Sequence, residues 1–375
     1  MKKFKLLLLC VICVFSANAQ NQIKKLDVKE IGKVKNIVLL IGDGMGVSQI
    51  YAGMTASQEP LNIESFKNIG FSKTYSASGY VTDSGAAGTA IATGKKTYDR
   101  AIGVDVDTLP QMSILEYAEM NGKSTGLVAT STITHATPAS FIAHQPERYM
   151  YEDIADDFLK TDIDVFIGGG LKHFNDRRDH RDLTRILSDN GYEVVTNLEE
   201  LQSTSGNKVA GLIYEDSPPK YSEGRGDMLP VSATVAVELL SKNENGFFLM
   251  IEGSQIDWGG HANDTEYIIA ELLDFDRTVG KVLNFAKADG NTLVIVTADH
   301  ETGGMGLVGG NMKEGHVEAN FATGDHTGVM VPVFAFGPGS ENFKGIYENT
   351  DLFVKMMNAF GFEQKNRHFK MLSYI

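Results

Sequence analysis

Residues 36–46 read NIVLLIGDGMG. The first six of these residues form a short run in which aliphatic side chains occupy successive positions. A run that is apolar on both faces is typical of a strand in a buried parallel sheet. Asp43 follows directly, between two glycines. The stretch therefore predicts an interior strand with a carboxylate at its C-terminal end.

Similar runs recur along the chain and alternate with helical patterns. The strand-like runs are 124–129, 164–167, 247–251, 292–296 and 331–336, and the helical patterns are 112–121, 154–160, 183–190, 233–242 and 263–287. This alternation predicts an α/β fold built in layers. No repeat, low-complexity stretch or linker interrupts it, so we predict one domain over residues 20–375. Residues 197–229 are polar and rich in turn formers, and we expect them to decorate the surface.

The first nineteen residues have the pattern of a secretory signal peptide. A basic start (residues 1–5) precedes an apolar run (residues 6–15) and a stretch of small residues that ends at Ala19. The apolar run is shorter than the roughly 20 residues that span a bilayer. We therefore predict cleavage near Ala19, a periplasmic or secreted protein, and no membrane anchor.

Cysteine content and charge exclude several function classes. Cys10 and Cys13 both lie in the signal, so the mature chain has no disulfide and no thiolate metal site. Cleavage leaves 31 basic and 48 acidic residues, a formal charge of −17. Such a balance argues against nucleic acid and anionic membranes as partners. An anionic substrate would need a local positive site, which bound divalent cations would provide.

Polar residues gather where the predicted strands end. Asp43, Glu252 and the pair Asp299-His300 each follow such a run, and residues 130–137 follow another. Ligand sites of parallel sheets lie at the carboxyl ends of the strands. Any single carboxylate there could instead cap a helix. Together they predict one site that offers oxygen and imidazole ligands.

Histidine and carboxylate pairs strengthen the metal hypothesis. Asp257 and His261 are four residues apart, which places them on one face if the segment is helical. His326 lies in a turn just before the 331–336 run. Imidazole and carboxylate together suit zinc, whereas ligands that are all oxygen suit magnesium. We assign no ligand role to the remaining histidines, and we expect His144 to be structural.

Ser84 lies in the small-residue run 81–90, which predicts the beginning of a tightly packed helix. A helix N-terminus favours an anion such as a phosphate or an alkoxide. A helix cap formed by Asp83 or Ser84 is the simpler explanation of this local pattern alone. The Gly-x-Ser-x-Gly elbow of serine hydrolases is absent around Ser84, and residues 42–46 do not match a dinucleotide loop.

Five motifs resemble those of the alkaline phosphatase family, and they occur in the family's order. They are GDGMG (42–46), TDSGAA (82–87), TGKKTY (93–98), EGSQID (252–257) and TADHETGG (297–304). The resemblance begins near Lys35 and runs to the end of the chain. It implies a three-layer α/β/α sandwich around a mostly parallel central sheet. The short chain resembles the compact bacterial members of the family, including cold-adapted ones.

The resemblance also implies a role for each matching residue. Ser84 matches the serine that is phosphorylated, and Arg148 matches the arginine that holds phosphate. The implied cofactors are two zinc ions and one magnesium ion, and the implied activity is hydrolysis of diverse phosphate monoesters at alkaline pH, with inorganic phosphate as product, by a homodimer. The implied ligands are Asp257, His261 and His326 for the first zinc, Asp43, Asp299 and His300 for the second, and Asp43, Thr137 and Glu252 for magnesium.

Two residues depart from the enteric pattern, and three other functions remain open. His135 replaces an aspartate beside the magnesium site, and Trp258 replaces a lysine; both are expected next to the ligands. A phosphodiesterase or sulfatase would share the metal geometry, although Ser84 with Arg148 favours the monoesterase. An exported protein that binds metal or phosphate without turnover is a second alternative. A serine hydrolase is the third.

Overall fold

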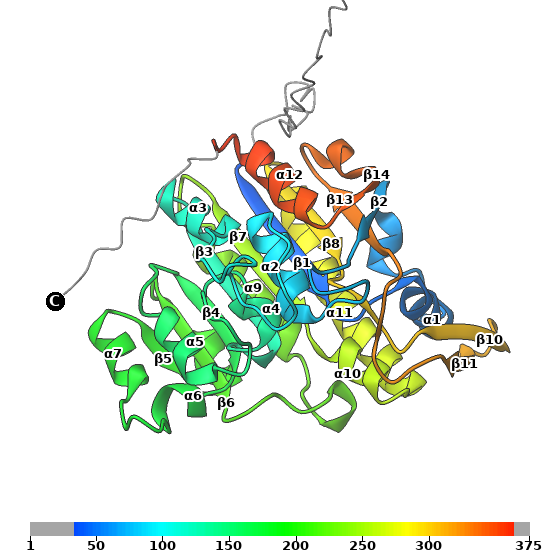
Figure 1. Cartoon of the computed structure of the whole chain (residues 1–375), viewed down its shortest axis with the longest axis horizontal. Helices are drawn as coiled ribbons and strands as arrows, with labels where there is room; N and C mark the ends of the chain where they lie inside the picture. Colours follow the sequence, from blue (N-terminus) through cyan, green and yellow to red (C-terminus); the bar gives the residue numbers. More distant parts are fainter. Residues whose placement is uncertain (1–33, 364–375) are drawn as a thin grey trace, which may run out of the picture. The chain divides into compact units, whose positions relative to one another are not determined.

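The computed structural model describes residues 34–363, which are organised around one ten-stranded sheet (Figure 1). The predicted signal peptide and its two cysteines lie outside the described residues. In spatial order the strands are β14 (Gly345–Glu348), β2 (Asn68–Lys73), β13 (Val331–Phe336), β8 (Thr292–Thr297), β1 (Asn36–Gly42), β7 (Phe247–Gly253), β3 (Ser124–Thr132), β4 (Val165–Gly169), β6 (Val209–Tyr214) and β5 (Glu193–Val195).

The sheet is parallel except for one strand. Among the described residues, β13 alone pairs antiparallel with both of its neighbours, β8 and β2. The expectation that 331–336 forms a strand is confirmed, but the expectation that this strand runs parallel to its neighbours was wrong. No long helix connects β8 to β13; the intervening chain forms only short antiparallel ladders. Without a crossover helix to carry it back across the sheet, the chain enters the next strand in the opposite direction.

Helices cover both faces of the sheet, which confirms the three-layer architecture. Along β1, Ile37, Leu39 and Ile41 pack into one core, and Val38 and Leu40 pack into the other. The first core is closed by α2 (Ser84–Thr93), α3 (Ile114–Met120), α4 (Ala136–Ala139), α5 (Tyr151–Asp157), α6 (Lys172–Asn175), α7 (Leu183–Asp189) and α12 (Thr350–Phe360), and the second by α1 (Val47–Ser57), α8 (Leu198–Ser203), α9 (Met228–Leu240), α10 (Gln255–His261) and α11 (Thr265–Asp289).

A second sequence expectation about the fold was also wrong. Residues 197–229 contain α8 and β6, and β6 is a buried strand between β4 and β5. Downstream of β6 the chain is also anchored: Arg225 is buried and its guanidinium pairs with Glu271 and Asp274 of α11. The polar residues that surround β6 conceal a short apolar strand, VAGLIY, which needs both faces covered.

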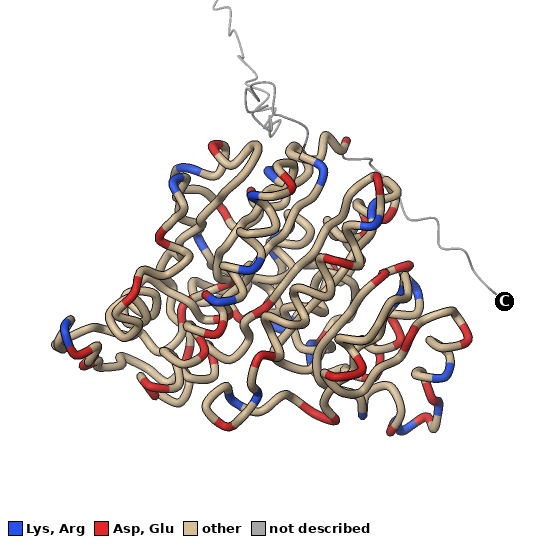
Figure 2. Tube along the Cα trace, turned by 180° about the vertical axis from the view of Figure 1, so that it is seen from behind, with Lys and Arg blue, Asp and Glu red and all other residues tan. Residues whose placement is uncertain are grey.

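Helix boundaries follow local capping chemistry. The longest helix, α11, begins where the Asp264 side chain accepts a hydrogen bond from the Tyr267 amide at 3.0 Å, and it ends at Gly290 in the left-handed conformation. Charged residues lie mainly on helices and loops, while the central strands are largely free of them (Figure 2). Across residues 34–363, no helix combines the length and apolar character that a bilayer crossing requires.

Candidate metal-binding active site

Three adjacent strands bring buried carboxylates to one edge of the sheet. Asp43 follows β1, Glu252 lies near the end of β7, and Asp299 follows β8. Because β1 pairs with both β7 and β8, the ends of these strands are neighbours. All three side chains are fully buried. The ends of these strands therefore bring the three predicted carboxylates together at one edge of the sheet.

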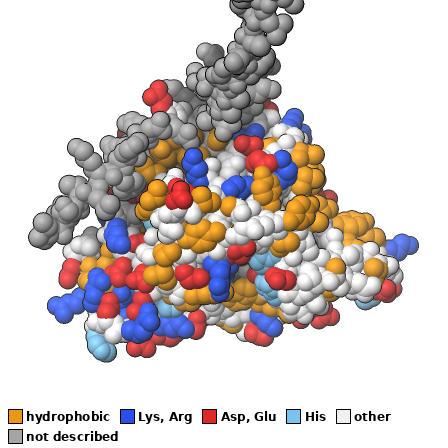
Figure 3. Space-filling model, in the orientation of Figure 1, with side chains coloured by type: hydrophobic (Ala, Val, Ile, Leu, Met, Phe, Trp, Pro, Cys, Tyr) orange, Lys and Arg blue, Asp and Glu red, His pale blue; other side chains and the backbone are white. Residues whose placement is uncertain are grey.

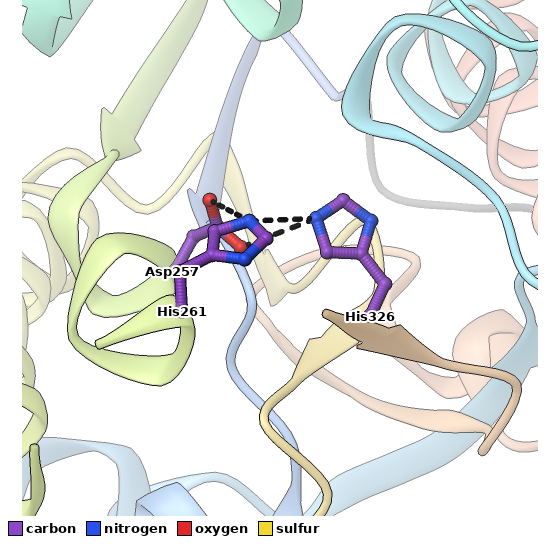
Figure 4. A group of neighbouring side chains, drawn as sticks. All are labelled: Asp257, His261 and His326. Atoms are coloured by element: carbon purple, nitrogen blue, oxygen red, sulfur yellow. Dashed lines mark hydrogen bonds and ion pairs between the residues drawn. The ribbon is translucent and has the colours of Figure 1, made fainter. Parts of the chain in front are cut away.

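The first side-chain cluster consists of Asp257, His261 and His326 (Figure 4). Asp257 and His261 lie on α10, which is helical despite its two glycines, so the spacing of four residues places them on one face. His326 comes from the two-residue strand β12 (His326–Thr327), which pairs with β9 (Glu301–Thr302) rather than forming a loose turn. The Asp257 carboxylate lies 3.4 Å from Nε2 of each histidine.

The two histidine rings of this cluster face each other through their Nε2 atoms. Nδ1 of His261 lies 2.8 Å from the Gly324 carbonyl, and Nδ1 of His326 lies 2.8 Å from the Thr82 carbonyl. A carbonyl only accepts, so each Nδ1 carries a proton, and the hydrogen bond to Asp257 raises the pKa of His261 to about 9. These Nε2 atoms are 3.2 Å apart. Two imidazole nitrogens this close, both facing the Asp257 carboxylate, suit a shared positive charge such as a proton or a metal ion.

The second cluster consists of Asp43, Asp299 and His300. Nε2 of His300 lies 3.4 Å from Asp43 Oδ1, 3.2 Å from Asp299 Oδ2 and 3.2 Å from Ser84 Oγ. Burial, together with the charge of Asp257, raises the pKa of Asp299 to about 6. Burial also lowers the pKa of His300 well below its usual range, so the ring is neutral.

A third group joins Asp43 and Glu252 to His135. Glu252 accepts a hydrogen bond from Ser254 Oγ at 2.6 Å through Oε2, and burial raises its pKa to about 7. Thr137, at the beginning of α4, is fully buried. The sequence placed His135 beside this group; the structure also gives its ring a nitrogen within reach of the two carboxylates.

The chemistry of these donors fits bound cations. Within the described residues, several buried atoms of the three groups lack a hydrogen-bond partner, namely both carboxylate oxygens of Asp43, Oε1 of Glu252, Oδ2 of Asp299, Oγ1 of Thr137 and Nδ1 of His135. Buried polar atoms without partners are rare in folded proteins, because each one costs free energy. Closely spaced carboxylates repel each other as well, and burial and the charge of Asp299 raise the pKa of Asp43 well above its usual range. Divalent cations would satisfy these atoms and this charge together.

Ser84 is the first residue of α2 and is buried beside the second cluster. Asp83 caps this helix, since its side chain accepts a hydrogen bond from the Ala86 amide at 3.0 Å. The same carboxylate accepts from Nη1 of Arg148 at 2.9 Å. Burial alone would raise the pKa of Asp83, but the Arg148 charge and two backbone amides lower it. Asp83 therefore positions both candidate catalytic side chains, a role that its capping pattern alone did not reveal.

The two residues that depart from the enteric pattern lie together. His135 and Trp258 meet edge to face, with ring centroids 6.1 Å apart. Nη2 of Arg148 is 3.4 Å from Nε2 of His135, and burial with the Arg148 charge lowers the pKa of His135 to about 3.

Histidine side chains reach the surface on the face shown in Figure 3, and the His261 side chain is 39% exposed. The site is thus open to solvent near the first cluster.

Two histidines to which the sequence assigned no ligand role are held by other contacts. His144 bridges the Gly103 carbonyl and the Glu116 carboxylate, in agreement with a structural role. His173 is buried and stacks on Tyr151, with centroids 4.8 Å apart, which differs from the polar surroundings that its sequence neighbours indicate.

Comparison with known proteins identifies the family. The alkaline phosphatase family model matches residues 34–318 and 308–362. Alkaline phosphatase 4 of Bacillus subtilis is 34% identical, over 90% of this chain and 92% of its own length. Alkaline phosphatase of Escherichia coli K12 is also 34% identical, over 87% and 86% of the two chains.

Solved structures agree with this result. The alkaline phosphatase of the Antarctic bacterium TAB5 is 44% identical and superimposes with a TM-score of 0.85, covering 89% of this chain and all of its own. A variant of the TAB5 enzyme has Mg bound in its M3 site. Family model, relatives and fold all agree: the chain belongs to the alkaline phosphatase family and is a phosphomonoesterase.

Proposed function

We propose that this enzyme hydrolyses phosphate monoesters through a phosphoserine at Ser84, with two zinc ions and one magnesium ion. The observation that carries the proposal is the position of Ser84. Its Oγ lies 3.2 Å from Nε2 of His300, at the N-terminus of α2 and beside the second of the three groups of side chains that could hold a metal ion. A nucleophile in that position combines a helix N-terminus, which favours anions, with neighbouring cation sites.

The proposed ligands divide by chemistry. Asp257, His261 and His326 would hold the first zinc, and Asp43, Asp299 and His300 the second. Asp43, Thr137 and Glu252 would hold magnesium: Asp43 and Glu252 lie together with the His135 imidazole, and the Thr137 side chain is fully buried. When bound, such cations act as Lewis acids that lower the pKa of a hydroxyl group and stabilise charge on entering and leaving oxygens.

The protein's own residues carry the covalent chemistry. The Ser84 oxygen attacks phosphorus, the bond from phosphorus to the alcohol oxygen breaks, and the alcohol leaves with a proton. Water then attacks the phosphoserine, which releases inorganic phosphate and restores the hydroxyl. Amides at the beginning of α2 favour the added negative charge. No deep pocket for the alcohol is required by this scheme, which supports a broad range of monoesters.

Arg148 would hold the phosphoryl oxygens during both steps. Its Nη1 donates a hydrogen bond to Asp83, while its Nε is buried without a hydrogen-bond partner in the described structure. The guanidinium is thereby oriented and still has a donor to offer.

Replacing Arg148 should weaken stabilisation of the transition state. We expect Arg148→Ala to lower kcat/KM for an aryl phosphate by about 10²-fold, the cost of losing one oxyanion donor. Arg148→Lys should recover little of the loss, because an ammonium group cannot reproduce the planar fork. Steady-state kinetics of both variants against Arg178→Ala, an exposed arginine outside the site, would measure this. Full activity of Arg148→Ala would refute the assignment.

The cation requirement tests the proposed function directly. Hydrolysis of a chromogenic aryl phosphate at alkaline pH should disappear after chelation and dialysis. Zinc and magnesium together should restore it, with zinc alone giving partial recovery. The His135 imidazole lies beside the proposed magnesium ligands, and imidazole is a ligand that suits zinc. Zinc alone and magnesium alone are therefore added back in separate experiments. Turnover that survives complete chelation would contradict the proposal.

Export to the periplasm or medium, and assembly as a homodimer, remain part of the proposal. The signal-like pattern that ends at Ala19 supports export. A cell-fractionation assay with an antibody against the folded chain, and light scattering on the purified protein, would test these two points.

A further inference from the structure

Thr302 lies where the segments that carry the candidate ligands converge. It is fully buried on β9 and is the pairing partner of His326 on β12. Its amide donates to the Gly44 carbonyl at 3.2 Å, and its carbonyl accepts from Gln49 Nε2 at 2.9 Å. Its backbone is therefore fixed by the loop that follows Asp43 and by α1.

The side chain of Thr302 connects the first cluster to the second. Its Oγ1 lies 2.5 Å from Asp257 Oδ1 and 3.2 Å from His300 Nδ1. A carboxylate oxygen only accepts, and a hydroxyl has a single proton to donate. The Thr302 proton is therefore directed to Asp257, and its oxygen accepts the proton on His300 Nδ1. The hydrogen bonds run in one direction, from His300 through Thr302 to Asp257.

Two glycines make room for this side chain. A Cβ at Gly44 would lie 2.8 Å from Thr302 Oγ1, and a Cβ at Gly260 would lie 2.8 Å from Thr302 Cγ2. The hydroxyl is thus packed against the backbone at Gly44, and the methyl group against the backbone at Gly260. This close packing on both sides holds the side chain in one rotamer.

We propose that Thr302 is a positioning residue that couples the two zinc clusters, an inference that rests on the proposed cation binding. By accepting from Nδ1, it fixes His300 in the tautomer whose Nε2 lone pair faces Ser84 and the second cluster. By donating to Asp257, it orients the carboxylate of the first cluster. One side chain thus holds a ligand of each cluster in place, and losing its hydroxyl should misalign both ligands.

Zinc binding to variants of the whole protein tests this coupling. Thr302→Val removes the hydroxyl and keeps the shape, whereas Thr302→Ser keeps the hydroxyl. The matched control is Thr278→Val on α11, where a buried threonine hydroxyl donates only to the Asp274 carbonyl. Metal-free proteins would be titrated with zinc in competition with a chromogenic chelator.

We expect Thr302→Val to bind zinc about 10- to 100-fold more weakly, as is usual when a hydrogen-bond partner behind a metal ligand is lost. Thr302→Ser and Thr278→Val should match the wild type. Wild-type affinity in Thr302→Val, or a loss in Thr302→Ser as large as in the valine variant, would overturn the inference. Far-UV circular dichroism checks folding; if the valine variant does not fold, Thr302→Ala provides the same comparison. A wild-type protein that binds no zinc would overturn the proposed function and the coupling together, whereas normal wild-type binding with an unaffected valine variant would overturn the coupling alone.

Discussion

Ser84→Ala should lose at least about 10³-fold in kcat on an aryl phosphate, because no other nucleophile replaces the hydroxyl. Within the described residues, Ser84 Oγ is buried beside His300 Nε2 at the first position of α2. Removing one oxygen atom from this position leaves the Asp83 cap and the Arg148 ion pair in place. Phosphate affinity and folding should therefore change little while turnover collapses.

A second buried serine provides the control for this prediction. Ser232 on α9 is also fully buried, and it lies outside the three ligand groups. Ser232→Ala should keep normal kinetics, and thermal unfolding should show that both variants fold. Turnover of Ser84→Ala near that of Ser232→Ala would mean that water, or another group, attacks phosphorus directly.

Asp43→Asn should have two large effects of opposite sign. Activity should fall by at least about 10³-fold, because Asp43 belongs to two of the three ligand groups and its loss weakens both. The metal-free protein, in contrast, should become more stable towards urea by about 1–3 kcal/mol. In the absence of cations Asp43 has no hydrogen-bond partner for either oxygen and is repelled by Asp299, Asp257 and Glu252.

The control is a buried aspartate whose oxygens are satisfied. Asp276 on α11 accepts hydrogen bonds from the amides of Asn62 and Ile63 at 2.8 and 3.0 Å. Asp276→Asn should destabilise the metal-free protein, since the new amide group would face a donor. Equal destabilisation by both substitutions would show that Asp43 is not held in an electrostatically unfavourable position.

The strands of the interior were predictable because their composition is decisive. All six apolar runs, including 36–41 and 247–251, are strands. The sequence could not give the direction of β13, because an antiparallel strand buried on both faces has the same composition as a parallel one. It also concealed β6, whose six residues lie among polar neighbours. Strand direction and sheet order depend on connections, which local patterns do not record.

The site could be predicted in its ligand types but not in its supporting contacts. Asp257 and His261 were identified by spacing, and Asp43 and Asp299 by their positions after strands. The role of Arg148 was predicted from the family resemblance alone, since nothing local distinguishes it from a surface arginine. Asp83 was recognised only as a helix cap, because its contact with Arg148 joins segments 65 residues apart. No local signal could link Thr302 to Asp257, which is distant in sequence, as well as to His300. Such bridging roles emerge only when the fold brings the segments together.

The covalent intermediate can be trapped, which tests whether Ser84 is the nucleophile. The metal-loaded enzyme would be mixed with a phosphate monoester, quenched in acid to stop hydrolysis, digested and analysed by mass spectrometry. The account predicts one added phosphoryl group, located on Ser84 in the peptide that contains residues 82–87, and absent from Ser84→Ala. Robust turnover without any phosphorylated Ser84 under these conditions, or with the phosphoryl group on another residue, would contradict it.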